Sequence, residues 1–384
     1  MEDPGVAIVG TGFMGWVHTE ALRRINVPIV GILGSSLGKS RLAASYLSIP
    51  RAYEDLSELV ADPYVTSVHI SSPNHCHFEQ VRKCLEHGKH VLCEKPLAMN
   101  SVESKRLVEL ASQTPDVVTG VNYNLRFSPL CMEARERITT GSLGDIRHIT
   151  GSYTQDWLSK DSDYNWRILS EEGGELRAVA DIGTHWFDLV SSISGLEVES
   201  VCADLHTVFK ERRRPLGEVT TFSENNPDSE AFQTFPVETE DFGAILLRFK
   251  GGARGTVFVS QVSPGRKNCL RYEIAGAEAT LAWDSEVGNE MWIGYRDKAN
   301  ETLIRDPALL SAPASAIASY PGGHNEGYAD TFKQCFKSFY DYIAHGDYLA
   351  ERPFASFSDG YREILLCEAI LKSHRKRCWV EIGE

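Results

Sequence analysis

Short apolar runs without polar alternation divide the first third of the chain into buried parallel strands. These runs cover residues 6–9, 29–33, 65–70, 91–93 and 117–121, and a strand that is covered on both faces has this pattern. Segments with apolar residues at helical spacing lie between them, at 17–25, 37–46, 55–61, 78–87 and 101–113, the last with Ser101 as its expected N-cap. This alternation predicts right-handed βαβ units and a parallel sheet.

The pattern changes after residue 122 to segments in which apolar and polar residues alternate. They lie at 146–153, 198–208, 242–249, 254–262, 270–275 and 291–295, and such alternation is typical of an antiparallel sheet. Helices are expected at 129–139, 183–194, 329–344 and 359–374, and the polar stretch 210–238 is expected to be a long surface loop. We therefore predict an α/β protein with a Rossmann domain, a doubly wound parallel sheet, over residues 1–122. A second α/β domain with a large, mainly antiparallel sheet is predicted over residues 123–384.

Composition narrows the class of protein. The chain has 384 residues, which suggests two or three domains. It carries 39 basic and 53 acidic residues and a net charge of −14, which argues against a nucleic-acid partner. No apolar run is long enough to cross a bilayer, and the first strand begins too early for a signal peptide. Nine cysteines without a CxxC pair indicate reduced thiols, so we expect a cytoplasmic protein without membrane partners.

A glycine-rich turn joins the first strand to the first helix. It reads Gly10-Thr11-Gly12-Phe13-Met14-Gly15, the GxGxxG pattern in the strand–turn–helix context that gives it meaning. Gly10 allows a tight turn, Gly12 lets the backbone approach a pyrophosphate, and Gly15 lets the helix lie close to the strand. The pattern predicts NAD or NADP binding by Gly10, Gly12, Phe13, Met14 and Gly15; the alternative is a glycine-rich turn in another kind of α/β domain.

The end of the second strand bears on the choice between the two nucleotides. Enzymes that prefer NAD often carry an acid there, whereas this chain reads Leu33-Gly34-Ser35-Ser36. We expect Ser35, Ser36 and Lys39 to contact the nucleotide and NADP to be at least tolerated.

A lysine follows a buried strand at His90-Val91-Leu92-Cys93-Glu94-Lys95-Pro96. Pro96 stops the strand because it has no N–H to donate. A lysine at this position faces the edge where open parallel sheets bind their ligands, although a surface lysine that ends a strand is the alternative interpretation.

Five motifs together resemble one enzyme family. They are Gly10 to Gly15; Ser72-Pro73-Asn74 with His77; Gly88 to Pro96; Asn122-Tyr123-Asn124-Leu125-Arg126-Phe127; and Asp181-Ile182-Gly183-Thr184-His185. Over nearly its whole length the chain resembles the glucose-fructose oxidoreductase / inositol dehydrogenase / rhizopine-catabolism (Gfo/Idh/MocA) oxidoreductases. The resemblance implies a Rossmann domain followed by a substrate-binding domain whose open sheet builds homodimers or homotetramers.

The resemblance also implies the catalytic residues Lys95, Asp181 and His185. We expect His185 to accept the hydroxyl proton, Lys95 to stabilise alkoxide character and Asp181 to orient the imidazole or bind substrate, although Lys95 and His185 could exchange roles. Asp181 and His185 are four residues apart and would share one helix face. This is also a metal-ligand spacing, but without further ligand motifs nearby no metal is expected. Further cofactor contacts are expected from Ser72, Pro73, Asn74, His77, Glu94, Lys95, Asn122 and Arg126.

Two further motifs resemble members of the family that act on sugars: the first resembles the branch that acts on anhydro-sugars and glycosides, and the second recurs in sugar-oxidising relatives. They are Tyr153-Thr154-Gln155-Asp156-Trp157 with Asn165-Trp166-Arg167, and Pro321-Gly322-Gly323-His324 with the four residues after it. The expected substrate contacts are Lys95, Tyr123, Gln155, Trp157, Trp166, Arg167, Asp181, His185 and His324. The tryptophans and His324 could instead be core or interface residues, and Tyr123 and Arg126 could pack at the domain boundary.

We therefore predict an NAD(P)-dependent oxidoreductase that interconverts a ring secondary alcohol and a ketone of a sugar, glycoside or cyclitol. One alternative is a redox-neutral enzyme that keeps its nucleotide bound. Another is a non-catalytic sugar or nucleotide sensor on the same fold.

Overall fold

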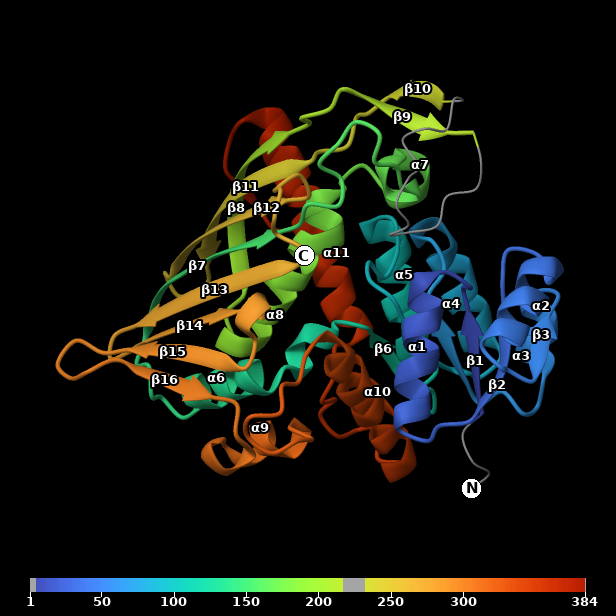
Figure 1. The fold of residues 1–384 in the computed structure, drawn as a ribbon, viewed down its shortest axis with the longest axis horizontal. Helices are drawn as coiled ribbons and strands as arrows, with labels where there is room; N and C mark the ends of the chain where they lie inside the picture. Colours follow the sequence, from blue (N-terminus) through green and yellow to red (C-terminus); the bar gives the residue numbers. More distant parts are fainter. Residues whose placement is uncertain (1–4, 217–231, 384) are drawn as a thin grey trace. The chain divides into compact units, whose positions relative to one another are not determined.

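The computed structural model describes residues 5–216 and 232–383 and divides the chain into two compact units (Figure 1). The first comprises residues 1–124 and 329–364, and the second comprises residues 125–328 and 365–384. The chain first passes from one unit to the other between residues 124 and 125, next to the domain boundary predicted from the sequence after residue 122. Segment 329–364, which the sequence-based division placed in the second domain, packs with the first unit.

The first unit is built on a six-stranded, fully parallel sheet with the order β3-β2-β1-β4-β5-β6. Its strands are β1 (Val6–Val9), β2 (Ile29–Leu33), β3 (Arg51–Tyr53), β4 (Ser67–Ile70), β5 (His90–Cys93) and β6 (Thr119–Val121). The order reverses between β1 and β4, and ligands of open α/β sheets bind at such a switch point. The predicted Rossmann fold is confirmed.

Helices follow the strands of this sheet as the apolar spacing predicts. They are α1 (Phe13–Arg24), α2 (Leu37–Tyr46), α3 (Leu56–Ala61), α4 (His77–Glu86) and α5 (Ser101–Gln113). The N-cap of α5 is Asn100 and not Ser101, because the Asn100 side chain accepts a hydrogen bond from the N–H of Glu103. The returning segment adds α10 (Tyr328–His345) and the start of α11 (Phe357–Lys376). Ala355, Phe357 and Ile364 of this segment lie in the core of the first unit.

The second unit is built on a nine-stranded sheet with the order β16-β15-β14-β13-β7-β12-β11-β8-β17. Only the β12–β7 pair is parallel among these described strands, so the predicted, mainly antiparallel sheet is confirmed. The strands are β7 (Ile146–Thr154), β8 (Val198–His206), β11 (Phe242–Phe249), β12 (Arg254–Ser260), β13 (Cys269–Gly276), β14 (Thr280–Asp284), β15 (Glu290–Gly294), β16 (Glu301–Ile304) and β17 (Val380–Glu381).

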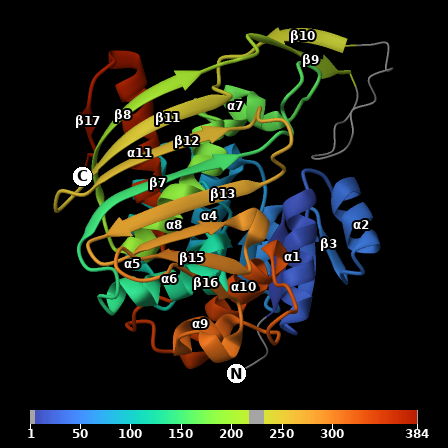
Figure 2. The same ribbon diagram turned by 60° about the vertical axis from the view of Figure 1, so that its left-hand side comes forward.

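Helices cover one face of this sheet and leave the other open (Figure 2). They include α6 (Pro129–Thr139), α8 (Thr184–Ser194) and the later part of α11, whose apolar residues join those of the strands in one core. Two short helices, α7 (Ser170–Gly173) and α9 (Ala312–Ile317), complete the unit. The strand β11 alternates between buried and exposed positions, as a sheet with one covered face requires.

The prediction of a surface loop at residues 210–238 is wrong at both ends of that stretch. Strands β9 (Glu211–Pro215) and β10 (Phe232–Pro236) pair there as an antiparallel hairpin. The run of arginines suggested a solvated segment, but Arg212 is buried and bonded to Asp241 at 2.7 Å. Residues 217–231 of the predicted loop lie outside the described residues.

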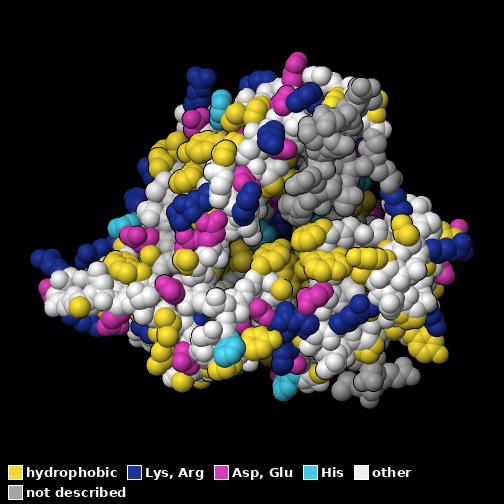
Figure 3. All heavy atoms as spheres, in the orientation of Figure 1, with side chains coloured by type: hydrophobic (Ala, Val, Ile, Leu, Met, Phe, Trp, Pro, Cys, Tyr) yellow, Lys and Arg dark blue, Asp and Glu magenta, His cyan; other side chains and the backbone are white. Residues whose placement is uncertain are grey.

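Acidic and basic side chains are interspersed over the face of the molecule shown in Figure 3. Among the residues that the structure describes, no helix combines the length and the apolar character needed to cross a membrane.

Candidate active site

The glycine-rich turn between β1 and α1 has the geometry of a pyrophosphate-binding turn. Gly10 has a φ of +118°, and a Cβ there would lie 2.6 Å from the carbonyl oxygen of Ser71. A Cβ on Gly15 would lie 2.2 Å from the carbonyl oxygen of Gly10, so both positions require glycine. A Cβ on Gly12 would have no atom within 4 Å. The backbone at Gly12 is therefore open to an approaching ligand, next to the positive end of α1.

The end of β2 presents hydroxyls and a lysine. Ser36 is the N-cap of α2, and its Oγ accepts from the N–H of Lys39 at 3.3 Å. Gly34 N–H donates to Ser40 Oγ at 2.8 Å, which fixes the turn, while Ser35 and the Lys39 side chain are exposed. No carboxylate stands between Leu33 and Ser40, so this turn carries no negative charge to repel a 2′-phosphate.

His77 ties together the segments that follow β4 and β5. Its Nδ1 lies 2.8 Å from the carbonyl oxygen of Pro96, and its Nε2 lies 2.9 Å from that of Ser72. The ring is fully buried. His77 therefore holds Ser72-Pro73-Asn74 against the Lys95-Pro96 segment and positions these predicted nucleotide contacts.

Glu94 precedes Lys95 at the end of β5 and is 7% exposed. Burial alone would raise its pKa. Hydrogen bonds from His18 (2.8 Å) and Asn122 (2.6 Å), together with the nearby Lys95, nevertheless hold the pKa of Glu94 below its usual value. Lys95 itself is half-buried and begins a cis peptide to Pro96. The end of β5 thus carries a fixed carboxylate followed directly by a lysine.

In the second unit, Asp181 lies in a π-helical turn, Val179–Gly183, that leads directly into α8. The helix predicted to begin at residue 183 therefore begins earlier and with wider turns. Single π-turns are frequent at functional sites. His185 lies in the first turn of α8, half-buried, with its ring centroid 6.3 Å from that of Tyr153.

Two side chains hold the carboxylate of Asp181. Gln261 Nε2 donates to Asp181 Oδ2 at 2.8 Å, and Arg167 Nε lies 3.3 Å from Asp181 Oδ1. The guanidinium of Arg167 also lies over the Trp166 ring, 4.4 Å from its centroid. Arg167, Trp166 and Asp181 thus form one contact group, as expected for residues of one site. The sequence analysis missed Gln261, whose one signal is a polar residue directly after the last residue of β12.

Two more predicted sugar contacts, Gln155 and Trp157, belong to a second contact group at the end of β7. Gln155 Nε2 and the Tyr153 hydroxyl both donate to Asn268 Oδ1, at 2.8 and 2.7 Å, and Trp157 Nε1 donates to Gln155 Oε1 at 2.8 Å. The Tyr153 ring contact with His185 joins this group to α8. Asp156 instead bonds Lys267 at 2.7 Å.

Three predicted site residues have other surroundings. Arg126 makes two hydrogen bonds to Asp188 on α8, at 2.8 and 2.5 Å, which fit the packing alternative, while its contact with the nucleotide stays a prediction. Tyr123 is 1% exposed in the first unit. His324 lies exposed in a loop whose carbonyl oxygens bond Arg305, including that of Pro321 at 3.1 Å. Among the described residues, His324 makes no hydrogen bond or ion pair with Asp181 or His185; its Nδ1 lies 3.3 Å from the carbonyl oxygen of Gly322.

A buried charge cluster supports the segment that carries Arg167. Both Arg177 and Arg212 bond Asp241, and all three side chains are fully buried. Arg212 also donates to the carbonyl oxygens of Leu158, at 2.9 Å, and Lys160, at 2.7 Å. Asp241 thereby anchors the chain that leads from Trp157 to Arg167.

The glycine-rich turn, the open backbone at Gly12 and the uncharged end of β2 fit a dinucleotide. Comparison with known families agrees. Residues 5–123 match the oxidoreductase family with an NAD-binding Rossmann fold, and residues 131–282 match the GFO/IDH/MocA C-terminal domain. These two matches define an NAD-binding oxidoreductase. The chain belongs to the Gfo/Idh/MocA family.

Individual relatives resemble the whole chain. It is 29% identical to the levoglucosan dehydrogenase of Pseudarthrobacter phenanthrenivorans, covering 100% of this chain and 99% of that one. It is 26% identical to the myo-inositol 2-dehydrogenase of Thermotoga maritima, covering 99% and 98%. A solved structure of levoglucosan dehydrogenase in complex with NADH and levoglucosan has a TM-score of 0.87 at 28% identity and covers 99% of each chain.

Proposed function

We propose that the chain interconverts a ring secondary alcohol and a ketone of a sugar, glycoside or cyclitol, with NAD or NADP. The observation that carries the proposal is the contact group of Asp181, Arg167, Trp166 and Gln261 beside His185. A ring with several hydroxyls requires donors and acceptors that an analogue would leave unpaired. The indole of Trp166 can cover the apolar face of a sugar or cyclitol ring. The relatives named for levoglucosan and inositol support the same substrate class.

The roles follow from the chemistry of the side chains. The nicotinamide, when bound, takes up or gives the hydride. His185 accepts the hydroxyl proton. Gln261 and Arg167 hold the carboxylate of Asp181, which in turn positions the polar groups around the imidazole of His185. Lys95 stabilises the negative charge that develops on the substrate oxygen.

Nicotinamide absorbance with a substrate panel tests the proposal. The panel contains levoglucosan, myo-inositol, scyllo-inositol, L-sorbose and simple glucosides, with a trans-dihydrodiol as the non-carbohydrate comparison. We expect turnover of at least one sugar or cyclitol and a ring ketone as product, at position 3 by the resemblance. Turnover of the dihydrodiol alone would contradict the proposal. Nucleotide absorbance that persists in the purified protein, without net turnover, would favour the redox-neutral alternative.

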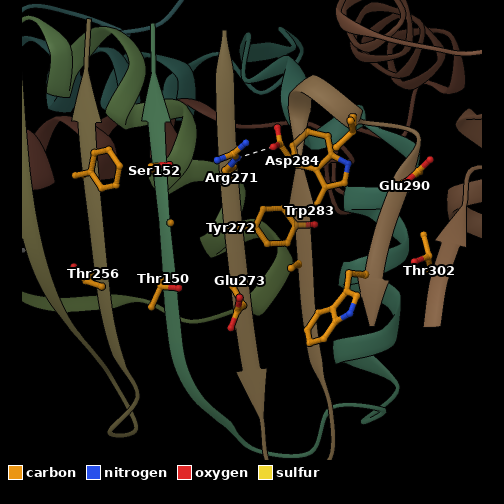
Figure 4. A pocket seen from close by; sticks show the side chains of 15 residues that line it. Thr150, Ser152, Thr256, Arg271, Tyr272, Glu273, Trp283, Asp284, Glu290 and Thr302 are labelled. Atoms are coloured by element: carbon orange, nitrogen blue, oxygen red, sulfur yellow. Dashed lines mark hydrogen bonds and ion pairs between the residues drawn. The ribbon is translucent and has the colours of Figure 1, made fainter. Parts of the chain in front are cut away.

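We also propose that a second copy of the chain covers the open face of the nine-stranded sheet. Leu246 is 50% exposed there on β11, and Phe258 is 45% exposed on β12. A concavity of about 600 Å³ lies on the same sheet, with Thr150, Thr256 and Glu273 on neighbouring strands (Figure 4). Exposed apolar side chains of this kind mark interaction surfaces, and the family resemblance supports a homodimer or homotetramer.

A further inference from the structure

A continuous chain of buried hydrogen bonds ends on Glu94. Ser67 Oγ lies 3.0 Å from the Tyr340 hydroxyl, and that hydroxyl lies 2.9 Å from His69 Nε2. The two histidines meet through their Nδ1 atoms at 2.9 Å, and His18 Nε2 lies 2.8 Å from Glu94 Oε1. We call these five residues the Glu94 chain. All of them lie in the first unit.

We propose that the Glu94 chain runs in one direction, from Ser67 to Glu94, and fixes Glu94 as a carboxylate directly before Lys95. His18 and His69 are then positioning residues for the proposed reaction. This inference rests on the proposed function.

The direction follows from counting donors and acceptors. A carboxylate only accepts, so His18 donates from Nε2. A doubly protonated His18 would donate to His69 as well and direct the remaining protons toward Ser67, whose hydroxyl would then lack an acceptor among the described residues, so the ring that satisfies the chain keeps a bare Nδ1. His69 must then donate from Nδ1, which leaves its Nε2 to accept from the Tyr340 hydroxyl, and Tyr340 accepts from Ser67. Burial holds the pKa of His69 well below its usual value, which agrees with a neutral ring. Every contact in the chain is satisfied with both histidines neutral.

The opposite direction leaves a donor without an acceptor. A protonated Glu94 would donate to His18, and each later proton would move one step toward Ser67. The Ser67 hydroxyl would then have no acceptor among the described residues, and Ser67 is fully buried. A buried hydroxyl without a partner is unfavourable. The carboxylate would also lose its charge beside Lys95.

The surroundings of the chain make it an anchor and not a path for protons. The ring of Phe336 lies edge-on to both histidines, with centroids 4.8 Å from His18 and 4.7 Å from His69. Tyr340 is 6% exposed. Because apolar rings pack against both imidazoles and both ends of the chain are buried, each hydrogen bond depends on its protein partner. The chain therefore fixes one protonation state of Glu94.

Two segments bond this carboxylate directly, and a third is linked to it through His69. His18 comes from α1, the helix that begins at the glycine-rich turn, and Asn122 follows β6 and donates at 2.6 Å. Tyr340 comes from α10 in the returning segment. The position of Glu94, and with it the start of the Lys95 side chain, is thereby set by the phosphate-binding helix and by α10 together.

Histidine-selective ¹⁵N NMR of the nucleotide-bound protein tests the direction without any turnover. We expect His18 as the Nε2–H tautomer and His69 as the Nδ1–H tautomer, assigned by the loss of signals in His18→Gln and His69→Gln. The reversed pair of tautomers, or a doubly protonated ring at either residue, would overturn the proposal. If the wild type turns over no polyol, the proposed function fails, while the tautomers still decide the direction.

Two variants of His18 test the positioning role. The His18→Gln amide reaches the position of Nε2 and keeps the donor to Glu94, whereas the shorter His18→Asn amide does not reach Glu94. We expect kcat to fall at least tenfold further in His18→Asn than in His18→Gln, with the KM for the nucleotide similar in both. Equal kcat values in two variants of equal thermal stability would show that His18 serves packing alone.

Discussion

Lys95 places an ammonium group directly after the fixed carboxylate of Glu94. If it stabilises the substrate oxygen only as charge develops, Lys95→Ala should lower kcat by about 10²–10³, the loss typical of one such donor. The affinity for NADH should change much less, because we expect the turn at Gly10 to Gly15 to bind the pyrophosphate. Steady-state kinetics and NADH fluorescence titration measure the two quantities.

Lys105→Ala is the matched control for this change. Lys105 is exposed on α5 of the same unit, so this variant removes the same charge from the surface, and alanine keeps the helix. We expect its kcat to equal that of the wild type. Near-normal turnover in Lys95→Ala would remove Lys95 from the mechanism.

Ser35, at the end of β2, tests which of the two nucleotides the protein prefers. Since the end of β2 has no acid, the wild type should use both nucleotides, with kcat/KM values less than ~10³-fold apart, or about 4 kcal/mol. Ser35→Asp should lower kcat/KM with NADP at least tenfold and leave NAD nearly unchanged, because the new charge repels a 2′-phosphate. Ser35→Ala removes the hydroxyl without adding charge and is the control. A wild type restricted to NAD beyond that limit would contradict our interpretation of this turn.

The sequence could predict the candidate site residues that stand inside motifs, and it could not predict their partners. Lys95, Asp181 and His185 each stand in a short pattern that can be recognised alone. Gln261 is 80 positions from Asp181, and His18 is 76 positions from Glu94. Such pairs are defined by which strands and helices become neighbours, and that information is not present in local spacing.

Among the elements, the parallel strands β1, β2, β4, β5 and β6 were predicted because each is an apolar run, whereas β3 was missed because its residues Arg51-Ala52-Tyr53 form no such run. The π-helical turn Val179–Gly183 was not predicted, since its apolar spacing resembles that of an ordinary helix. The β9–β10 hairpin was missed for a different reason. Its arginines suggested solvent, yet Arg213 and Arg214 lie over the rings of Phe232 and Tyr164, at 5.4 and 5.2 Å.

The π-helical turn depends on Glu240. The Glu240 carboxyl oxygen Oε1 accepts from the N–H of Val179 at 2.8 Å and from that of Arg177 at 3.0 Å. Glu240→Ala would leave both buried N–H groups without acceptors, so we expect a loss of about 3 kcal/mol in the free energy of unfolding. Glu240→Gln keeps one carbonyl oxygen and should lose less than half of that. Urea denaturation followed by circular dichroism measures both, and equal losses would show that the acceptor role is wrong.

Strand β5 begins with His90, whose pKa is lowered by burial to about 4. Its Nδ1 accepts from the N–H of Val118 at 2.9 Å, so the ring is neutral in the folded state. The unfolded chain takes up a proton near pH 6.5, and the folded state does so only near pH 4. The stability is therefore complete above pH 6.5 and falls with decreasing pH, by about 2 kcal/mol at pH 5.

His90→Asn tests this dependence. The asparagine carbonyl can accept the same N–H from Val118 but does not titrate. Between pH 7 and pH 5 its melting temperature should fall less than that of the wild type. Parallel curves for the two proteins would show that His90 does not contribute to the acid sensitivity.

On the scale of the whole molecule, the chain leaves its first unit at residue 124 and returns to it at residue 329. The helical pattern of 329–344 could be predicted because its apolar residues recur at helical spacing. The unit against which this helix packs could not be predicted, because the pattern of an amphipathic helix shows which face is buried but not which core covers it. Tyr340, which bonds His69 and Ser67, shows that this helix belongs to the parallel sheet.

The open face of the nine-stranded sheet carries the last prediction. Phe258 on β12 stands opposite Ala244 of β11, and Leu246 stands opposite Thr256, so these exposed residues share one face. A charge introduced among these apolar side chains would have to be buried without a partner if a second copy covers them. We expect the wild type to have two or four times the 42.7 kDa chain mass by light scattering, and Phe258→Glu to have the mass of one chain. Tyr46→Glu is the control, because Tyr46 is 80% exposed on α2 of the other unit and the same charge there should leave the mass unchanged. A wild type with the mass of one chain, or an unchanged assembly in Phe258→Glu, would show that this face does not join two copies.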